Sequence, residues 1–279
     1  MCTRVSRRAL CIVWAGLVLT GCRWYGAPKA EPEADLLAVG PDQEALSIPP
    51  DYVSEAIDAT GGLSTWIQTK EQRFAAVVAI YADDGSFYLT EHDVAVYPWS
   101  NAITISSHEP RAKFTWQLVD GQYDVKQGDT RLDVSPRAQA GRDYAGALLQ
   151  IATTPARLLA PGIVLSPRPA PVRIQGQWYQ PIEAKFPTQK VVVRKKGEEQ
   201  IVALDPYWTQ GVYYQNQKSR LVDLVWLGNP AAQRFLLVRG YDYVPVQEDG
   251  VLAPTKIELF RTDSQETFGV RLFQVDVKP

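Results

Sequence analysis

The stretch AKFTWQLVDGQYDVKQ, residues 112–127, decides the fold class. Apolar and polar side chains alternate from Phe114 to Leu118, which is the period of a strand with one buried and one exposed face. Asp120-Gly121 follows, and this dipeptide favours the tight turn of a β-hairpin. The segment 122–127 then returns along the first strand. The stretch therefore predicts an antiparallel hairpin with one apolar face.

The same pattern continues on both sides of this hairpin. Segments of strand length, rich in Val, Ile, Tyr and Phe, are separated by turn residues such as Asp83-Asp84-Gly85 and Gly128-Asp129. No repeat of solenoid period is present, and an all-β arrangement of this length fits one domain. The further segments predicted as strands are 73–82, 86–97, 101–107, 131–134, 190–196, 198–206, 220–228, 232–244, 255–261 and 268–277.

A first helix is predicted at the start of the folded domain. It follows Pro49-Pro50, with Asp51 as its N-cap and residues 52–60 as its body. Gly61-Gly62 ends it, because glycine adopts the left-handed conformation of a helix C-terminus. A short helical turn over 63–67 follows.

A second helical region interrupts the strands at 141–162, where apolar residues recur every three or four positions. Pro155 breaks this helix, and Thr153 or Thr154 is able to cap the second piece. A curved antiparallel sheet has a concave face that must be filled, and helices are its natural filling. If they fill it incompletely, the gap is an apolar pocket.

The N-terminal sequence MCTRVSRRALCIVWAGLVLTGC, residues 1–22, has the features of an export signal. Three arginines precede an apolar run, 9–20, which is shorter than the roughly 20 residues that a membrane-spanning helix needs. The run suits a signal peptide over residues 1–21, and a permanent anchor helix is the alternative. The pair Arg7-Arg8 also resembles a twin-arginine export signal, although the ordinary secretory route is favoured.

Leu19-Thr20-Gly21-Cys22 resembles the lipobox of bacterial lipoproteins, an aliphatic residue and two small residues before a cysteine. The resemblance implies cleavage before Cys22 and a diacylglycerol on its thiol.

Residues 22–50 then form a flexible linker rich in Pro, Ala and Glu with an r.m.s. reach of about 30 Å; an ordered arm around Leu36-Leu37 is the alternative. Because Arg23 and not an aspartate comes next, a lipid-anchored position in the cell envelope at the periplasmic face of the outer membrane is favoured, if the host has two membranes.

Composition excludes several classes of protein. The three cysteines are Cys2, Cys11 and Cys22, so the domain beyond them has no thiol for a nucleophile, a metal site or a disulfide. The chain has 29 Lys and Arg against 31 Asp and Glu. Without the three arginines of residues 1–21 the balance is 26 against 31, and no long basic block occurs. Nucleic-acid binding is therefore not expected.

Several further features occur together between residues 51 and 277. They are the helix ended by Gly61-Gly62, then Trp66, the Asp120-Gly121 hairpin, Leu204-Asp205-Pro206 and Leu252-Ala253-Pro254-Thr255-Lys256. Together they resemble the LolA/LolB superfamily of periplasmic lipoprotein carriers and outer-membrane lipoprotein receptors. The resemblance implies an α+β fold over residues 51–279, in which a strongly curved antiparallel sheet forms an unclosed β-barrel with helices filling or covering the concave face. It also implies an apolar cavity for acyl chains or other amphiphiles.

One departure from the superfamily concerns the early loops. Receptor members expose a leucine on a protruding hairpin loop, whereas neither 97–101 nor 107–111 contains one. Trp99 could replace it at a membrane, but a turn tryptophan packed on its own domain is favoured.

No catalytic or metal-binding pattern emerges from the sequence. His92 and His108 are the only histidines, and on a strand the side chain of His92 points away from those of Glu91 and Asp93, so no metal is expected. Nucleophile-elbow, phosphate-loop and dinucleotide motifs are absent. We therefore expect no enzyme activity and no cofactor, with a hydrolase as the least favoured alternative.

Aromatic and aliphatic residues are the remaining signal. Trp116, Trp178, Trp208 and Trp226 lie in or beside strand segments and are predicted to be core residues, some of which could line a pocket. The wholly apolar face at 114–118 is the best candidate. The predicted cavity residues are Phe74, Val78, Ile103, Ile105, Phe114, Trp116, Leu118 and Trp226.

These features predict an envelope lipoprotein, held at a membrane by the lipid on Cys22, that binds a hydrophobic ligand or lipoprotein acyl chains in its half-barrel. The alternative is an envelope sensor or interaction lipoprotein with a filled interior, which binds another envelope protein. A continuous apolar cavity favours the first hypothesis, and solid packing favours the second.

Overall fold

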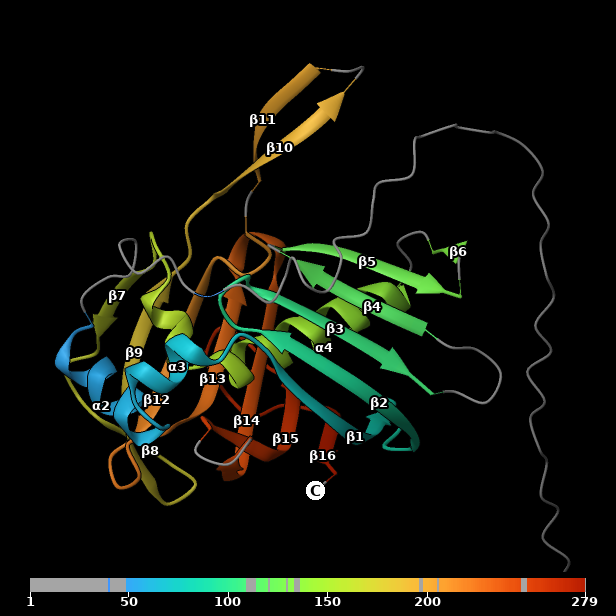
Figure 1. The fold of residues 1–279 in the computed structure, drawn as a ribbon. Coiled ribbons are helices and arrows are strands. Elements are labelled where there is room, and N and C mark those ends of the chain that lie inside the picture. The colour runs from blue at the N-terminus through green and yellow to red at the C-terminus, as the bar shows by residue number, and fades with distance from the viewer. Residues whose placement is uncertain are drawn as a thin grey trace, which may run out of the picture. The chain divides into compact units, whose positions relative to one another are not determined.

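The chain folds into one strongly curved antiparallel sheet around a central helix (Figure 1). This computed structural model describes residue 40 and residues 49–108, 114–119, 121–128, 130–132, 136–195, 198–204, 206–246 and 250–278, with side chains left undescribed at 136–138, 189–195 and 198–204. The expected signal peptide, Cys22 and nearly all of the expected linker lie outside the described residues.

Strands make up most of the described chain. The first group is β1 (Gln72–Tyr81), β2 (Phe87–Tyr97), β3 (Ala102–Ser107), β4 (Phe114–Val119), β5 (Gln122–Gln127), β6 (Thr130–Arg131), β7 (Val164–Pro167) and β8 (Val172–Ile174). The second group is β9 (Gln177–Lys185), β10 (Gln189–Lys195), β11 (Glu198–Leu204), β12 (Gln210–Asn216), β13 (Val222–Asn229), β14 (Arg234–Pro245), β15 (Leu252–Arg261) and β16 (Arg271–Val277).

The strand order confirms an unclosed half-barrel. It runs β6-β5-β4-β3-β2-β1-β16-β15-β14-β13-β12-β9-β7, with β8 beside β9, and neighbouring strands are antiparallel. Within the described residues β6 and β7 do not pair with each other, so the sheet keeps two edges. Near the middle of the sheet β1 pairs with β16, and Ala76 lies opposite Val277.

The predicted meander is confirmed, and four strands were missed. Val119 lies opposite Gln122 across the expected hairpin turn. The prediction omitted β7, β8, β9 and β12; β12 has no polar face to reveal a period of two, because it is buried on both sides. In the described part of the chain, β10 and β11 pair only with each other and do not extend the curved sheet.

Helix α4 (Pro136–Thr153) lies along the concave face of the sheet (Figure 1). Its predicted apolar face is confirmed, since Tyr144, Leu148 and Ile151 are at most 1% exposed. Gly141 allows the sheet to approach the helix closely, because a Cβ there would collide with the hydroxyl of Tyr123. The helix therefore fills the middle of the half-barrel.

Two shorter helices, α2 (Asp51–Ala59) and α3 (Leu63–Gln68), supply apolar side chains to the same core. Gly61 and Gly62 have φ angles of 116° and 86°, so they end α2 as predicted. Asp51 is the first residue of α2 and not its N-cap. Pro50 takes that position because its carbonyl accepts from the N–H groups of Val53 and Ser54, at 2.8 and 2.9 Å.

Trp66 holds α3 against the sheet. Its side chain is fully buried, and its indole N–H donates to Thr60 Oγ1 at 2.9 Å. Its carbonyl accepts from the indole N–H of Trp99 at 3.0 Å. Trp99 therefore packs on its own domain, as the favoured interpretation predicted.

Pro155 follows α4, and the short η1 helix (Ala156–Leu159) comes next. The predicted cap by Thr153 or Thr154 is wrong. Their hydroxyls donate to carbonyls four residues earlier, at 2.7 and 2.6 Å, because those carbonyls of the last helical turn are the nearest acceptors.

None of the helices that the structure describes combines the length and the apolar character needed to cross a membrane.

A second apolar cluster lies on the outer face of the sheet. In β13 the side chains of Val225 and Leu227 face the main core, whereas Leu224 and Trp226 belong to the outer cluster. The short η2 helix (Pro230–Ala232) leads from β13 to β14. The second half of the sheet therefore carries buried apolar side chains on both of its faces.

Candidate ligand-binding site

A cavity of about 610 Å³ lies at one end of the half-barrel, and we name it the end cavity. Its walls come from the end of β1, the start of β14, the facing ends of β15 and β16, and the first turns of α4. The volume lies in the range of roughly 300–1,000 Å³ that is usual for small-molecule sites.

The end cavity has an apolar wall and a charged rim. Ile80, Leu236 and Phe273 line its inner side, and the last two are buried. At the rim, Arg261 and Asp83 form an ion pair at 3.3 Å, with both side chains more than half exposed. Such a pair adds little stability. The arrangement can accept an apolar chain while a polar head remains in water.

Tyr207 is hydrogen-bonded to two residues that line the end cavity, although it does not itself line that cavity. Its hydroxyl donates to Asp143 and accepts from the amide of Gln139, two residues of α4 that line the cavity. The guanidinium carbons of Arg142 and Arg234 lie 3.9 and 4.4 Å from the centre of its ring. Burial raises the pKa of Asp143, and the bond from Tyr207 and the nearby arginines oppose that rise.

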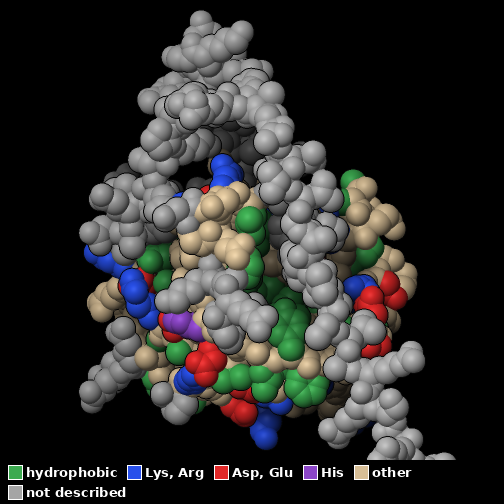
Figure 2. Space-filling model, turned by 90° about the vertical axis from the view of Figure 1, so that its right-hand side faces the viewer, with side chains coloured by type: hydrophobic (Ala, Val, Ile, Leu, Met, Phe, Trp, Pro, Cys, Tyr) green, Lys and Arg blue, Asp and Glu red, His purple; other side chains and the backbone are tan. Residues whose placement is uncertain are grey.

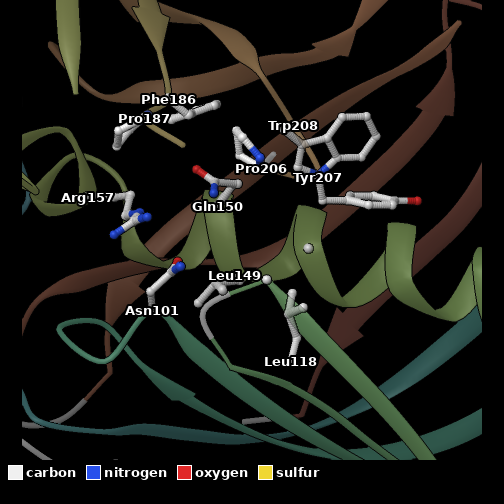
Figure 3. A pocket seen from close by; sticks show the side chains of 12 residues that line it. Asn101, Leu118, Leu149, Gln150, Arg157, Phe186, Pro187, Pro206, Tyr207 and Trp208 are labelled. Atoms are coloured by element: carbon white, nitrogen blue, oxygen red, sulfur yellow. The ribbon is translucent and has the colours of Figure 1, made fainter. Parts of the chain in front are cut away.

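A smaller cavity of about 80 Å³, the seam cavity, lies between the two arms of the half-barrel (Figure 3). Leu118 of β4 comes from one arm, and Phe186 and Trp208, which flank the β10–β11 hairpin, come from the other. Helix α4 contributes Gly146, Leu149 and Gln150, and η1 contributes Arg157. Tyr207 lines this cavity too, so its ring lies between the seam cavity and residues of the end cavity.

One stripe of α4 serves both cavities. Gln139 and Asp143 line the end cavity, and Gly146 and Gln150 line the seam cavity. Their spacing of four, three and four residues places them on one side of a helix. The sequence prediction followed the neighbouring apolar stripe and missed this one. The signal that could have revealed it is a row of polar and small residues along a helix whose other faces are apolar.

Most of the residues predicted to line a cavity belong to the main core instead or pack against it. Val78, Ile103 and Ile105 have no exposed surface, and Leu118, which is 6% exposed, lines the seam cavity. Phe74 and Trp116 are partly buried against the main core. Phe114 is also partly buried and stacks on Trp116, with ring centres 6.3 Å apart.

The structure corrects the placement of two tryptophans. Trp226 does not lie with the other predicted cavity residues, because the alternation of β13 turns it to the outer face, where it stacks on Phe235. Trp178, predicted to be core, is 51% exposed because β9 turns it away from both clusters. Trp208 is buried, as predicted.

The histidines take separate environments. His92 is buried, with Nδ1 3.0 Å from the hydroxyl of Tyr144, whereas Glu91 and Asp93 are exposed on the other face of β2. His108 Nε2 lies 2.5 Å from a carboxylate oxygen of Asp93. Among the residues that the structure describes, no three His, Asp or Glu side chains gather in a way that could hold a metal ion.

The surface in Figure 2 mixes hydrophobic side chains with clusters of both charges. Large hydrophobic side chains that the described residues expose include Phe87, Tyr88 and Leu89 at the start of β2, which are 54–62% exposed. They follow the β1–β2 turn, whose first residues line the end cavity.

Comparisons with known proteins gave matches in solved structures alone. A scan against protein-family models and a search of curated proteins found no match. Similar structures include a LolA superfamily protein from Nitrosomonas europaea, with 12% identity, 82% of this chain and 90% of that chain covered and a TM-score of 0.46. A DUF1329 family protein from Desulfovibrio piger has 11% identity, coverages of 82% and 92% and a TM-score of 0.49. A putative outer membrane lipoprotein-sorting protein domain from Vibrio parahaemolyticus has 9% identity, coverages of 82% and 89% and a TM-score of 0.48.

Proposed function

We propose that this protein is a lipid-anchored envelope lipoprotein that binds a hydrophobic or acyl-chain ligand in the end cavity. The observation that carries the proposal is a cavity of about 610 Å³ with an apolar inner wall and a charged rim. An acyl chain would displace water from that wall, at about 0.8 kcal/mol for each methylene buried. The polar head would remain beside Arg261 and Asp83.

Filling the end cavity is expected to weaken ligand binding more than tenfold. Ala140 lines the cavity from the exposed side of α4, so Ala140→Phe places a ring where the chain would lie. Displacing two methylenes costs about 1.6 kcal/mol, which exceeds a factor of ten in affinity. The parent chain and the variant, both carrying Cys22→Ala, are titrated with a dansylated undecanoic acid. The fluorescence of the probe gives the affinity of each chain.

The matched control is Ala170→Phe, an identical substitution at an exposed position outside both cavities. It should leave the affinity of the probe unchanged. If Ala140→Phe binds the probe as tightly as the parent chain does, or if the parent chain does not bind the probe, the proposal is contradicted.

The membrane anchor is a separate part of the proposal. Cys22→Ala removes the thiol that would accept the diacylglycerol, so incorporation of labelled palmitate should be lost and a longer, uncleaved chain should accumulate. Cys11→Ala is the control, because that cysteine lies within the expected signal peptide, and labelling should persist. Unchanged labelling of Cys22→Ala would refute the lipobox assignment.

A packed interior supports a second candidate function. Val78, Ile103 and Ile105 are buried in the main core and have no exposed surface. An interaction lipoprotein that binds another envelope protein on its outside would need no ligand cavity. If the parent chain fails to bind the fluorescent fatty acid, this second function becomes the better account.

A further inference from the structure

We propose that the ligand of the end cavity carries an anionic head group, a carboxylate or a phosphate, which binds between the guanidinium groups of Arg234 and Arg261. The inference rests on the proposed ligand-binding function, because it concerns the same cavity, and it adds the charge of the head. Both arginines line the end cavity, and they are the only cations among its lining residues in the described part of the chain.

The sheet places the two arginines as neighbours on one face. Arg261 of β15 lies directly opposite Leu236 of β14, and Arg234 lies two residues before Leu236 on the same face of β14. Diagonal neighbours of this kind lie roughly 7–8 Å apart, a distance that long side chains can bridge. Two like charges at this spacing repel each other, so an anion between them is stabilising. The oxygens of a carboxylate or a phosphate can accept from both guanidinium groups.

Arg234 has no carboxylate partner of its own. Its guanidinium carbon lies 4.4 Å from the centre of the ring of Tyr207, and within the described residues it takes part in no ion pair. The contact with the ring does not use the N–H groups of the guanidinium as hydrogen-bond donors. Those donors are therefore available to an acceptor in the cavity.

Arg261 has a partner that an anionic head can replace. Its Nη1 lies 3.3 Å from a carboxylate oxygen of Asp83, and the two side chains are 58% and 83% exposed. An exposed pair of this kind is weak, because water screens it and two long side chains lose freedom in forming it. The head of a ligand whose chain is already bound in the cavity competes with Asp83 at a high effective concentration.

Asp143, the other acid in the lining, is engaged by protein groups. Its Oδ1 accepts from the hydroxyl of Tyr207 and, at 3.3 Å, from the amide of Gln139. Burial raises the pKa of this carboxyl group, and the charges of three nearby arginines oppose the rise. Asp143 is thus held by its own neighbours and does not occupy the space between the two arginines of the rim.

The balance of charge favours an anion. Asp83 and Asp143 are the acids that line the cavity, and Arg234 and Arg261 balance them. Arg142 adds a third cation, whose charge also reaches Asp143. Of the described charges that line the cavity or act on Asp143, the positive ones therefore exceed the negative ones by one. A cationic head should accordingly be disfavoured.

Calorimetric titration with chains of equal length tests the charge of the head. The protein carries Cys22→Ala, and decanoate, decyl phosphate, decanol and decyltrimethylammonium are used below the concentrations at which they form micelles. At pH 8 at least one of the two anions should bind about tenfold more tightly than decanol, and the cation should bind more weakly than decanol. The anion that binds more tightly identifies the preferred head.

Variants separate the head from the chain. Arg234→Gln should weaken the binding of that anion about tenfold and leave decanol unchanged, whereas Arg234→Lys should retain most of the affinity. Asp83→Asn removes the competitor for Arg261, so the anion should bind about twofold to fivefold more tightly. Arg173→Gln, at an exposed position of β8, is the control and should have no effect. Ala140→Phe should weaken the anion and decanol alike.

The outcomes distinguish this inference from the proposed function. If the parent chain binds decanol as tightly as both anions, the anionic head is overturned and the ligand-binding function stands. If it binds none of the four compounds, both are overturned. Unchanged affinity for the anion in Arg234→Gln also overturns the inference, and the affinity of the same variant for decanol shows whether its cavity is intact.

Discussion

Replacing Trp66 with alanine is expected to lower the free energy of unfolding by about 4 kcal/mol, within the range for truncation of a buried tryptophan. The indole is fully buried in the main core, so its removal leaves a cavity between α3 and the sheet. Thr60, which is also buried, loses the indole N–H that donates to its hydroxyl. Urea denaturation followed by circular dichroism measures the loss.

Trp178→Ala is the matched control. The same residue type is removed, but from a position that is 51% exposed, and the expected loss is about 1 kcal/mol or less. Comparable losses in the two variants would show that α3 does not pack on the sheet as described.

Acidification from pH 6.5 to pH 4 is expected to remove up to about 3 kcal/mol of stability through His92. Burial and the charge of His108 lower the pKa of His92 to about 4, whereas an unfolded histidine has a pKa of about 6.5. The unfolded chain therefore takes up the proton first as the pH falls, and unfolding becomes easier across this window. His92→Gln removes the titration and should abolish this loss.

Asp223 is expected to act in the opposite direction. Burial raises its pKa to about 6, although the nearby polar groups of Tyr179 and Asn216 and the charge of Arg239 oppose that rise. The folded chain holds this proton more tightly than the unfolded chain, whose aspartate has a pKa of about 3.9. Stability is therefore lost as the pH rises from about 4 to 6, by up to about 3 kcal/mol at neutral pH. Asp223→Asn should remove this loss.

Between pH 4 and pH 6 these two contributions oppose each other in the parent protein. Relative to the parent, the unfolding free energy of His92→Gln should fall with rising pH, and that of Asp223→Asn should rise. Urea midpoints at pH 4, 5, 6 and 7 measure both slopes. Variant profiles that run parallel to the parent would contradict the burial of these groups.

Strands could be predicted from the sequence where one face of the strand is polar and the other is apolar. Alternation from Phe114 to Leu118 and the turn at Asp120-Gly121 were sufficient to predict β4 and β5. In β12 the same logic fails, because Gln215 and Asn216 are buried and hydrogen-bonded to Tyr52 and Gln177, partners remote in sequence. Polar residues in such a strand indicate a buried network and not an exposed face.

The candidate site was less predictable than the sheet. A period of two assigns residues to a face but does not say whether a helix fills the space above them. Ile103 and Ile105 are therefore on the expected concave face, yet α4 covers them completely. The end cavity is formed instead by residues such as Ile80, Asp143 and Arg261, which are far apart in the sequence and meet only in the folded chain.

The pairing of β1 with β16 has a consequence for folding kinetics. Ala76 and Val277 are about 200 residues apart, and contacts of such separation form slowly because the loop between them must close first. During synthesis β1 emerges long before its partner, so the centre of the sheet cannot be completed until the last strand has been made. Until then β1 is paired with β2 alone, so one edge of β1 stays open to water and to other unpaired strands.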